Sequence, residues 1–249
     1  MSFSDKVVLV TGSSSGIGAA TALAFAREGA KVVIVGRSHE KVEKVAAKFA
    51  GLHTPLTISA DVSDDHQAAS LIQKTIDHFG KLDVLVNNAG ISRPATVLQG
   101  NLLAAYDEVL ATNLRAAIHL TTLATPHLIK TKGNIINMAS VVGVIPPSDL
   151  SFLASSVSKA GLIHFTKGAA LELAPHGVRV NVISPGPVRT DILDSIGTSA
   201  TWEDFQKLTA LNRVSEPDEL ADLILFLASD KAKSITGCNY VIDNGMLLK

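Results

Sequence analysis

The fold of this chain is decided by one stretch near its start, Val7-Val8-Leu9-Val10-Thr11-Gly12-Ser13-Ser14-Ser15-Gly16-Ile17-Gly18. Four consecutive apolar residues predict a strand buried on both faces, and the alanine-rich segment 16–28 predicts a helix. Gly12 permits the sharp turn between them, Gly16 lets a pyrophosphate approach the backbone, and Gly18 lets helix and strand pack closely. The N-terminus of the helix offers free N–H groups and a partial positive charge, so this stretch predicts a dinucleotide-binding site.

The alternation of apolar runs and helical patterns continues along the whole chain. Most of the runs lack a polar face, which is typical of parallel strands covered on both sides. Strands are expected at 6–11, 31–35, 56–59, 82–87, 134–139, 178–184 and 239–242. Helices are expected at 16–28, 40–49, 64–79, 102–129, 151–174 and 217–228, with Asp64 as a cap and Pro217 in a first turn. This order predicts an α/β fold, a Rossmann-like doubly wound parallel sheet of about seven strands with helices on both faces, in a single domain over 1–249.

Composition narrows the class of protein. The chain has 249 residues, of which 47% are apolar and 18% charged, and a net charge of −1 leaves no basic face for nucleic acid or anionic lipid. No apolar run approaches the ~20 residues of a membrane span, and no signal peptide is visible, so we expect a cytoplasmic protein. Cys238 is the only cysteine and is expected to be buried, and the eight histidines show no metal-ligand spacing, so no metal site is expected.

The stretch 191–212 interrupts the regular alternation, and it carries the lone Trp202. Ligands of open α/β sheets bind beyond the carboxyl ends of the strands, where a long excursion after the strand at 178–184 would lie. We interpret 191–212 as a candidate substrate lid, and the alternative is a loop with a surface helix and a packed tryptophan.

Three further motifs stand in the order that such a fold requires. Asn87-Asn88-Ala89-Gly90 ends the fourth expected strand, Asp61-Val62 follows the third, and Pro185-Gly186-Pro187-Val188-Arg189-Thr190 follows the sixth. With the spacing GxxxGxG after Thr11, they make the whole chain resemble the short-chain dehydrogenase/reductase family. The resemblance implies a nicotinamide dinucleotide held by Gly12, Ser14, Ser15, Gly16, Ile17, Gly18, Asp61, Val62, Asn88, Ala89, Gly90, Lys159, Pro185, Gly186, Val188 and Thr190.

The end of the second expected strand, Val35-Gly36-Arg37-Ser38, bears on the choice of cofactor. NAD-selective sites carry Asp or Glu there for the ribose 2′-hydroxyl. No carboxylate is present here, and the guanidinium of Arg37 can pair with a 2′-phosphate, with Ser38 and Ser15 adding hydrogen bonds. The sequence favours NADP(H), and NAD(H) is the alternative if Arg37 stacks on adenine or stays in solvent.

In the family that this chain resembles, carbonyl reduction uses a tyrosine, a lysine four residues later, a serine and an asparagine. The tyrosine protonates the substrate oxygen, the lysine binds the nicotinamide ribose and lowers the tyrosine pKa, the serine hydrogen-bonds the oxygen, and the asparagine holds a water. The resemblance assigns these last three roles to Lys159, Ser140 and Asn113. The residue four positions before Lys159 is Ser155, so serine replaces the tyrosine.

A serine at position 155 cannot take over the role of the tyrosine directly. Its hydroxyl is far less acidic than a phenol of pKa ~10, and its side chain is roughly 4 Å shorter, while direct proton transfer needs about 2.6–3.2 Å. A water that bridges Ser155, Ser140 and the substrate oxygen is the remaining route. Because general acid catalysis contributes ~10²–10⁴-fold, we expect reduced turnover.

Two functions fit this pattern. The first is an NADP(H)-dependent oxidoreductase that interconverts an alcohol and a ketone or aldehyde with impaired turnover. The second is a catalytically inactive NADP(H)-binding protein, a sensor, an oligomer partner or an engineered inactive variant. We favour the first, and an apolar pocket wall suggests a lipophilic substrate: Pro146, Pro147, Leu150, Phe152, Leu153, Ile192, Leu193, Ile196 and Trp202.

The long helices expected at 102–129 and 151–174 bear on the oligomeric state. Both are apolar around more of their circumference than one sheet face requires. Members of the family usually associate through the corresponding helices, so the resemblance implies a homotetramer or a dimer.

Overall fold

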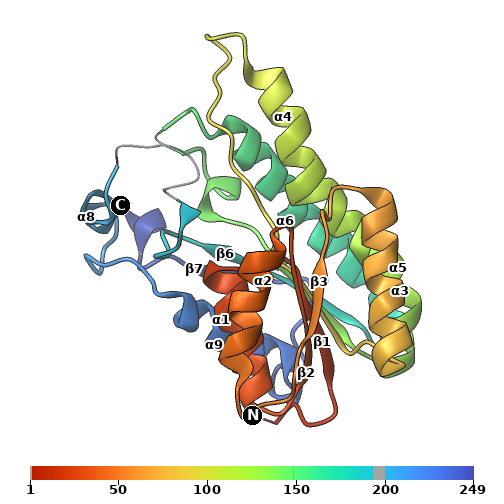
Figure 1. Cartoon of the computed structure of the whole chain (residues 1–249). Coiled ribbons are helices and arrows are strands. Elements are labelled where there is room, and N and C mark those ends of the chain that lie inside the picture. The colour runs from red at the N-terminus through yellow and green to blue at the C-terminus, as the bar shows by residue number, and fades with distance from the viewer. Residues whose placement is uncertain (1, 148, 193–199) are drawn as a thin grey trace.

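The computed structural model of the chain describes residues 2–147, 149–192 and 200–249. Its centre is one seven-stranded sheet with the order β3-β2-β1-β4-β5-β6-β7, and every neighbouring pair is parallel (Figure 1). The strands are β1 (Val7–Val10), β2 (Lys31–Gly36), β3 (Leu56–Ser59), β4 (Val84–Asn87), β5 (Asn134–Met138), β6 (Arg179–Pro185) and β7 (Asn239–Ile242). All carboxyl ends of the strands therefore point the same way, and the loops that follow them share one edge of the sheet.

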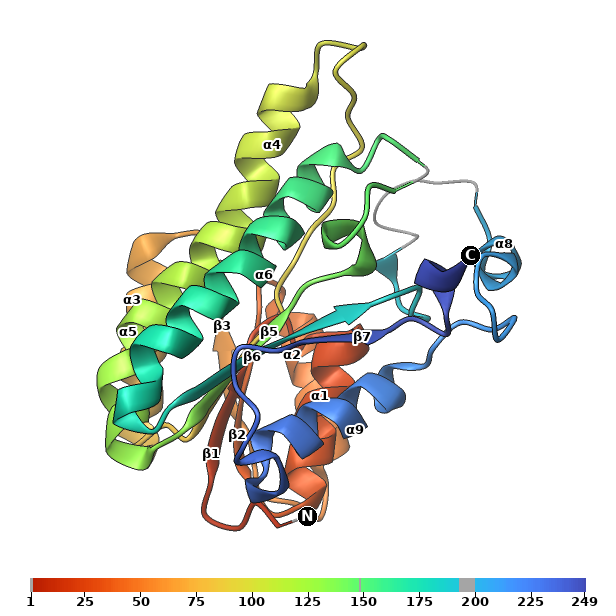
Figure 2. The same ribbon diagram turned by 180° about the vertical axis from the view of Figure 1, so that it is seen from behind.

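Helices cover both faces of the sheet, as the two opposite views in Figures 1 and 2 show. One face carries α1 (Gly16–Arg27), α2 (His39–Ala46) and α9 (Pro217–Ala228). The other face carries α3 (Asp65–Phe79), α5 (Ala116–Thr131) and α6 (Leu153–Leu173), and α4 (Leu102–Leu110) packs on α6. The remaining helical elements are α8 (Trp202–Lys207), a π-helix (Ala111–Arg115) and 3₁₀ turns at Ala47–Phe49, Val141–Gly143, Ala174–His176, Asp230–Ala232 and Met246–Leu248.

Strand β1 shows why the sheet needs cover on both sides. Val8 and Val10 pack into the hydrophobic cluster beneath α1 and α9, whereas Val7 and Leu9 pack into the cluster beneath α3, α5 and α6. All four side chains are fully buried, and alternate residues of a strand point to opposite faces. An unbroken apolar run is therefore the pattern that a central parallel strand requires.

The predicted fold class is confirmed, and the expected elements are present with small shifts at their ends. Asp64 caps α3, because its carboxylate accepts a 2.9 Å hydrogen bond from the backbone N–H of Gln67, and Pro217 opens α9. The one helix expected over 102–129 is interrupted by the π-helix. The prediction that Cys238 is buried is wrong: it is exposed, because it immediately precedes β7, the last strand at one edge of the sheet.

The candidate lid over 191–212 lies partly outside the described residues, which omit 193–199. Its described part includes α8, which begins with a capping box between Thr201 and Asp204. Trp202 of this helix lies beneath the guanidinium of Arg189, 5.7 Å from the ring centroid. Within the described residues, no helix is both long and apolar enough to cross a membrane.

Candidate cofactor and active site

The loop between β1 and α1 is fastened to the end of β4. The hydroxyl oxygen of Thr11 accepts hydrogen bonds from the N–H groups of Asn88, at 3.0 Å, and Ala89, at 3.1 Å. The amide of Asn88 donates in return to the carbonyl oxygens of Thr11, at 2.9 Å, and Gly12, at 3.1 Å. Gly12 has φ +64°, and a Cβ on Gly18 would collide with the carbonyl oxygen of Gly12. The glycines are thus required by the turn and by its close packing.

The N-terminus of α1 is open to a bound anion. Ser15 occupies the N-cap position with no hydrogen bond from its side chain, and the first turn holds no acidic residue. Ser14, Ser15, Gly16 and Ile17 are all partly exposed. A Cβ on Gly16, which has φ +52°, would lie 3.0 Å from Cγ2 of Thr190, so the loop after β6 adjoins this helix end. The backbone N–H groups and positive end of the helix suit phosphate groups.

The end of β2 adjoins the same loop. A Cβ on Gly36 would lie 2.7 Å from the side chain of Ser14. Arg37 and Ser38 follow and are exposed, and Arg37 forms no hydrogen bond or ion pair with another described residue. The hydroxyl oxygen of Ser38 accepts a 3.3 Å hydrogen bond from the N–H of Lys41 and so caps α2.

Asp61 follows β3 and so lies at the same carboxyl edge of the sheet as the loop after β1 and the end of β2. Its carboxylate accepts hydrogen bonds from the N–H of Ser63, at 2.9 Å, and from the Ser63 hydroxyl, at 2.6 Å. Partial burial raises the pKa of Asp61, but these hydrogen bonds and the charge of Arg37 outweigh it and hold the pKa below its usual value. Asp61 is therefore an anion beside a cation, with Val62 buried next to it.

Asn113 lies in the π-helix between α4 and α5. Its Oδ1 accepts a 2.8 Å hydrogen bond from the N–H of Ile91, and its Nδ2 donates to the carbonyl oxygen of Ile91, at 2.9 Å, and to the hydroxyl of Ser158, at 3.2 Å. A Cβ on Gly90 would lie 3.4 Å from Oδ1 of Asn113 and 3.5 Å from Nζ of Lys159. Asn113 of the π-helix and Lys159 of α6 thus both lie against the segment that follows β4.

Lys159 lies in α6 with its amine largely enclosed. Its Nζ donates a 2.6 Å hydrogen bond to the carbonyl oxygen of Met138, the last residue of β5. Burial lowers the pKa of Lys159 to about 8, from 10.5 for an unperturbed lysine. A strongly shifted pKa in a group that lies at this edge of the sheet marks a functional-site candidate.

Ser140 follows β5 directly and begins the 3₁₀ turn Val141–Gly143. Its hydroxyl accepts a 3.4 Å hydrogen bond from the N–H of Val142 and donates one of 3.4 Å to the carbonyl oxygen of Pro185. A Cβ on Gly143 would lie 2.7 Å from the backbone of Lys159. The loop after β5 therefore contacts both the last residue of β6 and the backbone of α6 at Lys159.

Ser155 lies one helical turn before Lys159 and is 8% exposed. Its hydroxyl oxygen lies 2.9 Å from that of Ser92, and its carbonyl oxygen accepts a 2.7 Å hydrogen bond from the Ser158 hydroxyl. No pattern in the sequence marks Ser92 as a site residue, because no spacing rule applies to the second residue after Gly90. The structure brings Asn113, Lys159 and Gly90 together and pairs Ser155 with Ser92.

A family model described as Enoyl-(Acyl carrier protein) reductase matches residues 12–247. The crystal structure of a short-chain dehydrogenase/reductase of unknown function from Caenorhabditis elegans, with cofactor, is 36% identical and has a TM-score of 0.93. It covers 99% of this chain and 96% of that chain. This chain belongs to the short-chain dehydrogenase/reductase family. As a short-chain dehydrogenase/reductase it is an oxidoreductase with a nicotinamide cofactor.

Relatives of this short-chain dehydrogenase/reductase carry several activities. The 3-oxoacyl-acyl-carrier-protein reductase FabG of Thermotoga maritima is 36% identical over all of both chains. The meso-2,3-butanediol dehydrogenase of Serratia marcescens is 34% identical and covers 98% of this chain and 96% of its own length. Membership of the family establishes the class of reaction, oxidoreduction. The substrates in the relatives' names range from an acyl chain on a carrier protein to a small diol.

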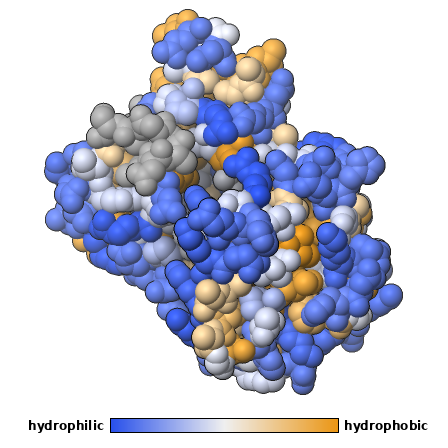
Figure 3. Space-filling view, viewed as in Figure 1, coloured by the Kyte–Doolittle hydropathy of each residue, from blue (hydrophilic) through white to orange (hydrophobic). Residues whose placement is uncertain are grey.

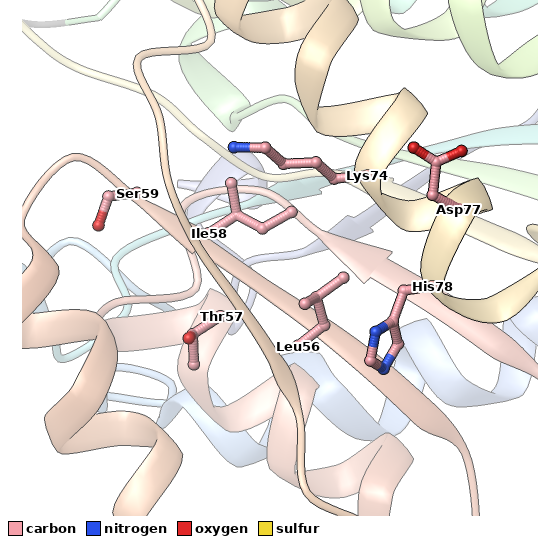
Figure 4. Close-up of a pocket in the computed structure, with 7 residues that line it drawn as sticks. All are labelled: Leu56, Thr57, Ile58, Ser59, Lys74, Asp77 and His78. Carbon is pink, nitrogen blue, oxygen red and sulfur yellow. The ribbon is translucent and has the colours of Figure 1, made fainter.

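A separate shallow depression of about 430 Å³ lies between the edge strand β3 and α3 (Figure 4). Leu56 and Ile58 lie on the same side of the strand as Lys74, Asp77 and His78 of the helix. None of the predicted site residues lines it, so it is distinct from the cofactor edge. Across the ranges that the structure describes, no three His, Cys, Asp or Glu side chains gather as a metal site would require.

Proposed function

We propose that this chain is an NADP(H)-dependent oxidoreductase that interconverts a lipophilic alcohol and its ketone or aldehyde, with turnover lowered by Ser155 at the position of the family's tyrosine. One observation carries the proposal. Asn113, Lys159 and Gly90 meet at the carboxyl edge of the sheet, beside the open N-terminus of α1. This site has counterparts of the family's asparagine, serine and lysine but no tyrosine, so we expect it to transfer hydride slowly.

The residues present fit the cofactor. The turn formed by Gly12, Gly16 and Gly18 and the uncapped start of α1 would hold the pyrophosphate, and Thr190 adjoins that turn. Asp61 and Val62 would line the adenine side, with Asn88, Ala89 and Gly90 along the ribose. Once bound, the cofactor supplies a hydride or accepts one.

The preference for NADP(H) rests on Arg37. Arg37 is exposed and directly follows Gly36, which lies against Ser14; it forms no ion pair with the described residues, and no carboxylate stands at the end of β2 to compete with a phosphate. A planar guanidinium matches a phosphate with two parallel hydrogen bonds. Ser38, whose oxygen caps α2, retains its own hydroxyl proton for a second contact.

The chain's own residues would then divide the remaining work. Lys159 contributes a cation beside the nicotinamide ribose, and Asn113 holds the segment 90–91 against α6. Ser140 turns its single O–H from the long 3.4 Å hydrogen bond with Pro185 to donate to the substrate oxygen. Ser155 lacks the acidity of a phenol, so the alcohol oxygen takes its proton from a water that bridges Ser155 and the substrate, and the resulting hydroxide regains a proton from solvent.

A lipophilic substrate is supported by apolar side chains near the candidate site. Val144 and Ile145 follow the turn after Ser140 and are 43% and 49% exposed, and Leu150 is 57% exposed just before α6. Exposed apolar side chains beside a site commonly form its wall. Ketones with an aliphatic chain, including 3-oxoacyl thioesters such as the FabG relative's name indicates, are the first substrates to test.

The second candidate function is cofactor binding without turnover. It is favoured by the Ser92–Ser155 hydrogen bond, because this contact already engages the one hydroxyl that position 155 could offer to a substrate or a bridging water. Such a protein would act as a sensor or as a partner in an oligomer.

The deciding experiment measures NADPH oxidation with a panel of aliphatic ketones and 3-oxoacyl thioesters, for the wild type and for Ser155→Tyr. The cofactor dissociation constant is measured for both by NADPH fluorescence. We expect equal cofactor binding, measurable wild-type turnover, and a gain of about 10²–10⁴-fold in the variant. Turnover in the variant alone would establish the second candidate function, and equal rates would show that Ser155 does not limit the reaction.

We also propose a homotetramer or dimer. Leu103 and Tyr106 on α4 and Val157 and Leu171 on α6 expose large apolar side chains, with Leu171 80% exposed. Figure 3 shows further hydrophobic residues on the projecting end of the molecule where α4 begins, and there Leu98 is 99% exposed. A monomer by light scattering at micromolar concentration would contradict this proposal.

A further inference from the structure

The hydroxyls of Ser92 and Ser155 form a hydrogen-bonded pair in which one of the two hydroxyl protons has no acceptor among the described residues. Their oxygens are 2.9 Å apart, and either can be the donor. Two hydroxyls carry two protons, and their mutual hydrogen bond uses one. Neither hydroxyl bonds to any other described residue, although Ser92 is 9% and Ser155 8% exposed. The pair therefore keeps one O–H without an acceptor in a largely dry environment, where a missing partner is costly.

The backbone around Ser92 is held from three sides. The N–H of Ile91 donates to the Asn113 amide oxygen, and its carbonyl oxygen accepts from the Asn113 amide nitrogen. The guanidinium of Arg93 donates a 3.0 Å hydrogen bond to the carbonyl oxygen of Ser92 and pairs with the carboxylate of Glu108 at 2.6 Å. The N–H of Ala95 donates a 2.9 Å hydrogen bond to the carbonyl oxygen of Ser151. The segment therefore runs along α6, with Gly90 beside Lys159 and Ser92 beside Ser155 one turn away.

We propose that Ser92 is a positioning residue: it donates to Ser155 and so directs the Ser155 hydroxyl as a hydrogen-bond donor to the water that bridges it to the carbonyl oxygen of the substrate. A carbonyl oxygen only accepts, so the bridging water donates to it and accepts from Ser155, in the arrangement in which Ser92 donates to Ser155 and Ser155 donates outward. Donors in such a chain polarise one another. This inference rests on the proposed function, because it assigns a contact to the same ketone substrate.

The test combines Ser92→Ala, Ser155→Ala and the double variant, with Ser92→Thr as the conservative replacement. Ser156→Ala is the matched control, since the Ser156 hydroxyl also lies on α6 but bonds to the backbone oxygen of Phe152. For each protein, kcat and KM are measured with an aliphatic ketone and NADPH. The dissociation constant of that ketone from the protein–NADPH complex is measured by fluorescence, which does not require turnover.

We expect Ser92→Ala to weaken ketone binding and lower kcat/KM about three- to tenfold, with NADPH affinity and melting temperature unchanged. Ser92→Thr should retain wild-type values, and Ser92→Ala should have no further effect once Ser155 is alanine. Wild-type ketone binding in Ser92→Ala, or effects that add in the double variant, would overturn the inference and leave the proposed function intact. A wild type that neither binds nor reduces any ketone of the panel would overturn the proposed function, and this inference with it.

Discussion

The ammonium nitrogen of Lys159 donates a 2.6 Å hydrogen bond to the carbonyl oxygen of Met138, which ties α6 to the last residue of β5. The same enclosure lowers the pKa of Lys159 to about 8 in the folded protein, while in the unfolded chain the amine titrates near 10.5. The folded state thus binds the proton less tightly than the unfolded state does. Below pH 8 both states hold it, and the folded protein carries the full cost of the buried charge.

This difference predicts that Lys159 becomes less destabilising as the solution becomes more alkaline. Between pH 8 and 10.5 the folded state has released a proton that the unfolded state keeps, so the free energy of unfolding rises with pH. Compared with Lys159→Met, the wild type should gain about 2–3 kcal/mol between pH 7 and 10.5. Urea unfolding of both proteins without cofactor measures this. Parallel pH curves would show that the amine titrates normally.

Gly18→Ala should destabilise the fold and abolish cofactor binding. Its Cβ would meet the carbonyl oxygen of Gly12, so the turn must open, at a cost of about 1–3 kcal/mol. The matched control is Gly168→Ala in α6, where a Cβ would meet nothing within 4 Å and should stabilise the helix by roughly 0.5–1 kcal/mol. Thermal unfolding with and without NADPH compares the two. Equal melting temperatures would contradict the close packing of Gly18.

Asn113→Ala should cost about 2–3 kcal/mol, because it removes three hydrogen bonds and leaves both backbone groups of Ile91 without their partner. Asn101→Ala is the control, since that exposed side chain accepts one 3.1 Å hydrogen bond from the N–H of Thr96. Denaturant titration should show a much smaller loss for the control. If both variants lose equal stability, the clamp on Ile91 contributes nothing beyond an ordinary surface contact.

Arg37→Gln should raise the dissociation constant of NADPH about tenfold or more while leaving that of NADH unchanged, since only NADPH carries the 2′-phosphate. Fluorescence titration at two salt concentrations measures it, and the wild-type preference for NADPH should fall as salt rises. Arg27→Gln, in the last turn of α1, is the matched control. Equal losses for both cofactors would place Arg37 against the adenine instead.

Sequence patterns predicted the layers of this molecule well because the physics behind them is local. The apolar run Val7–Val10 and the glycines after it need no distant partner to be interpreted, and the structure reproduces both. Positions of the strands followed from the same rule, and so did the meeting of their carboxyl ends. The end of α9 at Ala228 was predicted to the residue.

Some tertiary features could not be predicted from the sequence, because they depend on residues that are distant along the chain. Nothing in Ala111–Arg115 distinguishes a π-helix from an α-helix, because the partners of its side chains, such as the carbonyl oxygen of Ile91 that Asn113 binds, belong to other segments. The contact between Ser92 and Ser155 joins residues 63 positions apart. Cys238 was misjudged because the usual burial of cysteine says nothing about a position just before an edge strand.

The π-helix also changes the rotation of α5 relative to α4 within the continuous helical segment that the three elements form. One added residue rotates everything beyond it by about 100° relative to an uninterrupted helix. The two halves can therefore present their apolar stripes in different directions: α4 packs on α6, while α5 packs on α3 and the sheet. One continuous helical segment can thus pack against two sets of neighbours. Deleting one residue from Ala111–Arg115 would rotate one half so that its apolar side chains no longer face α6 or no longer face α3 and the sheet.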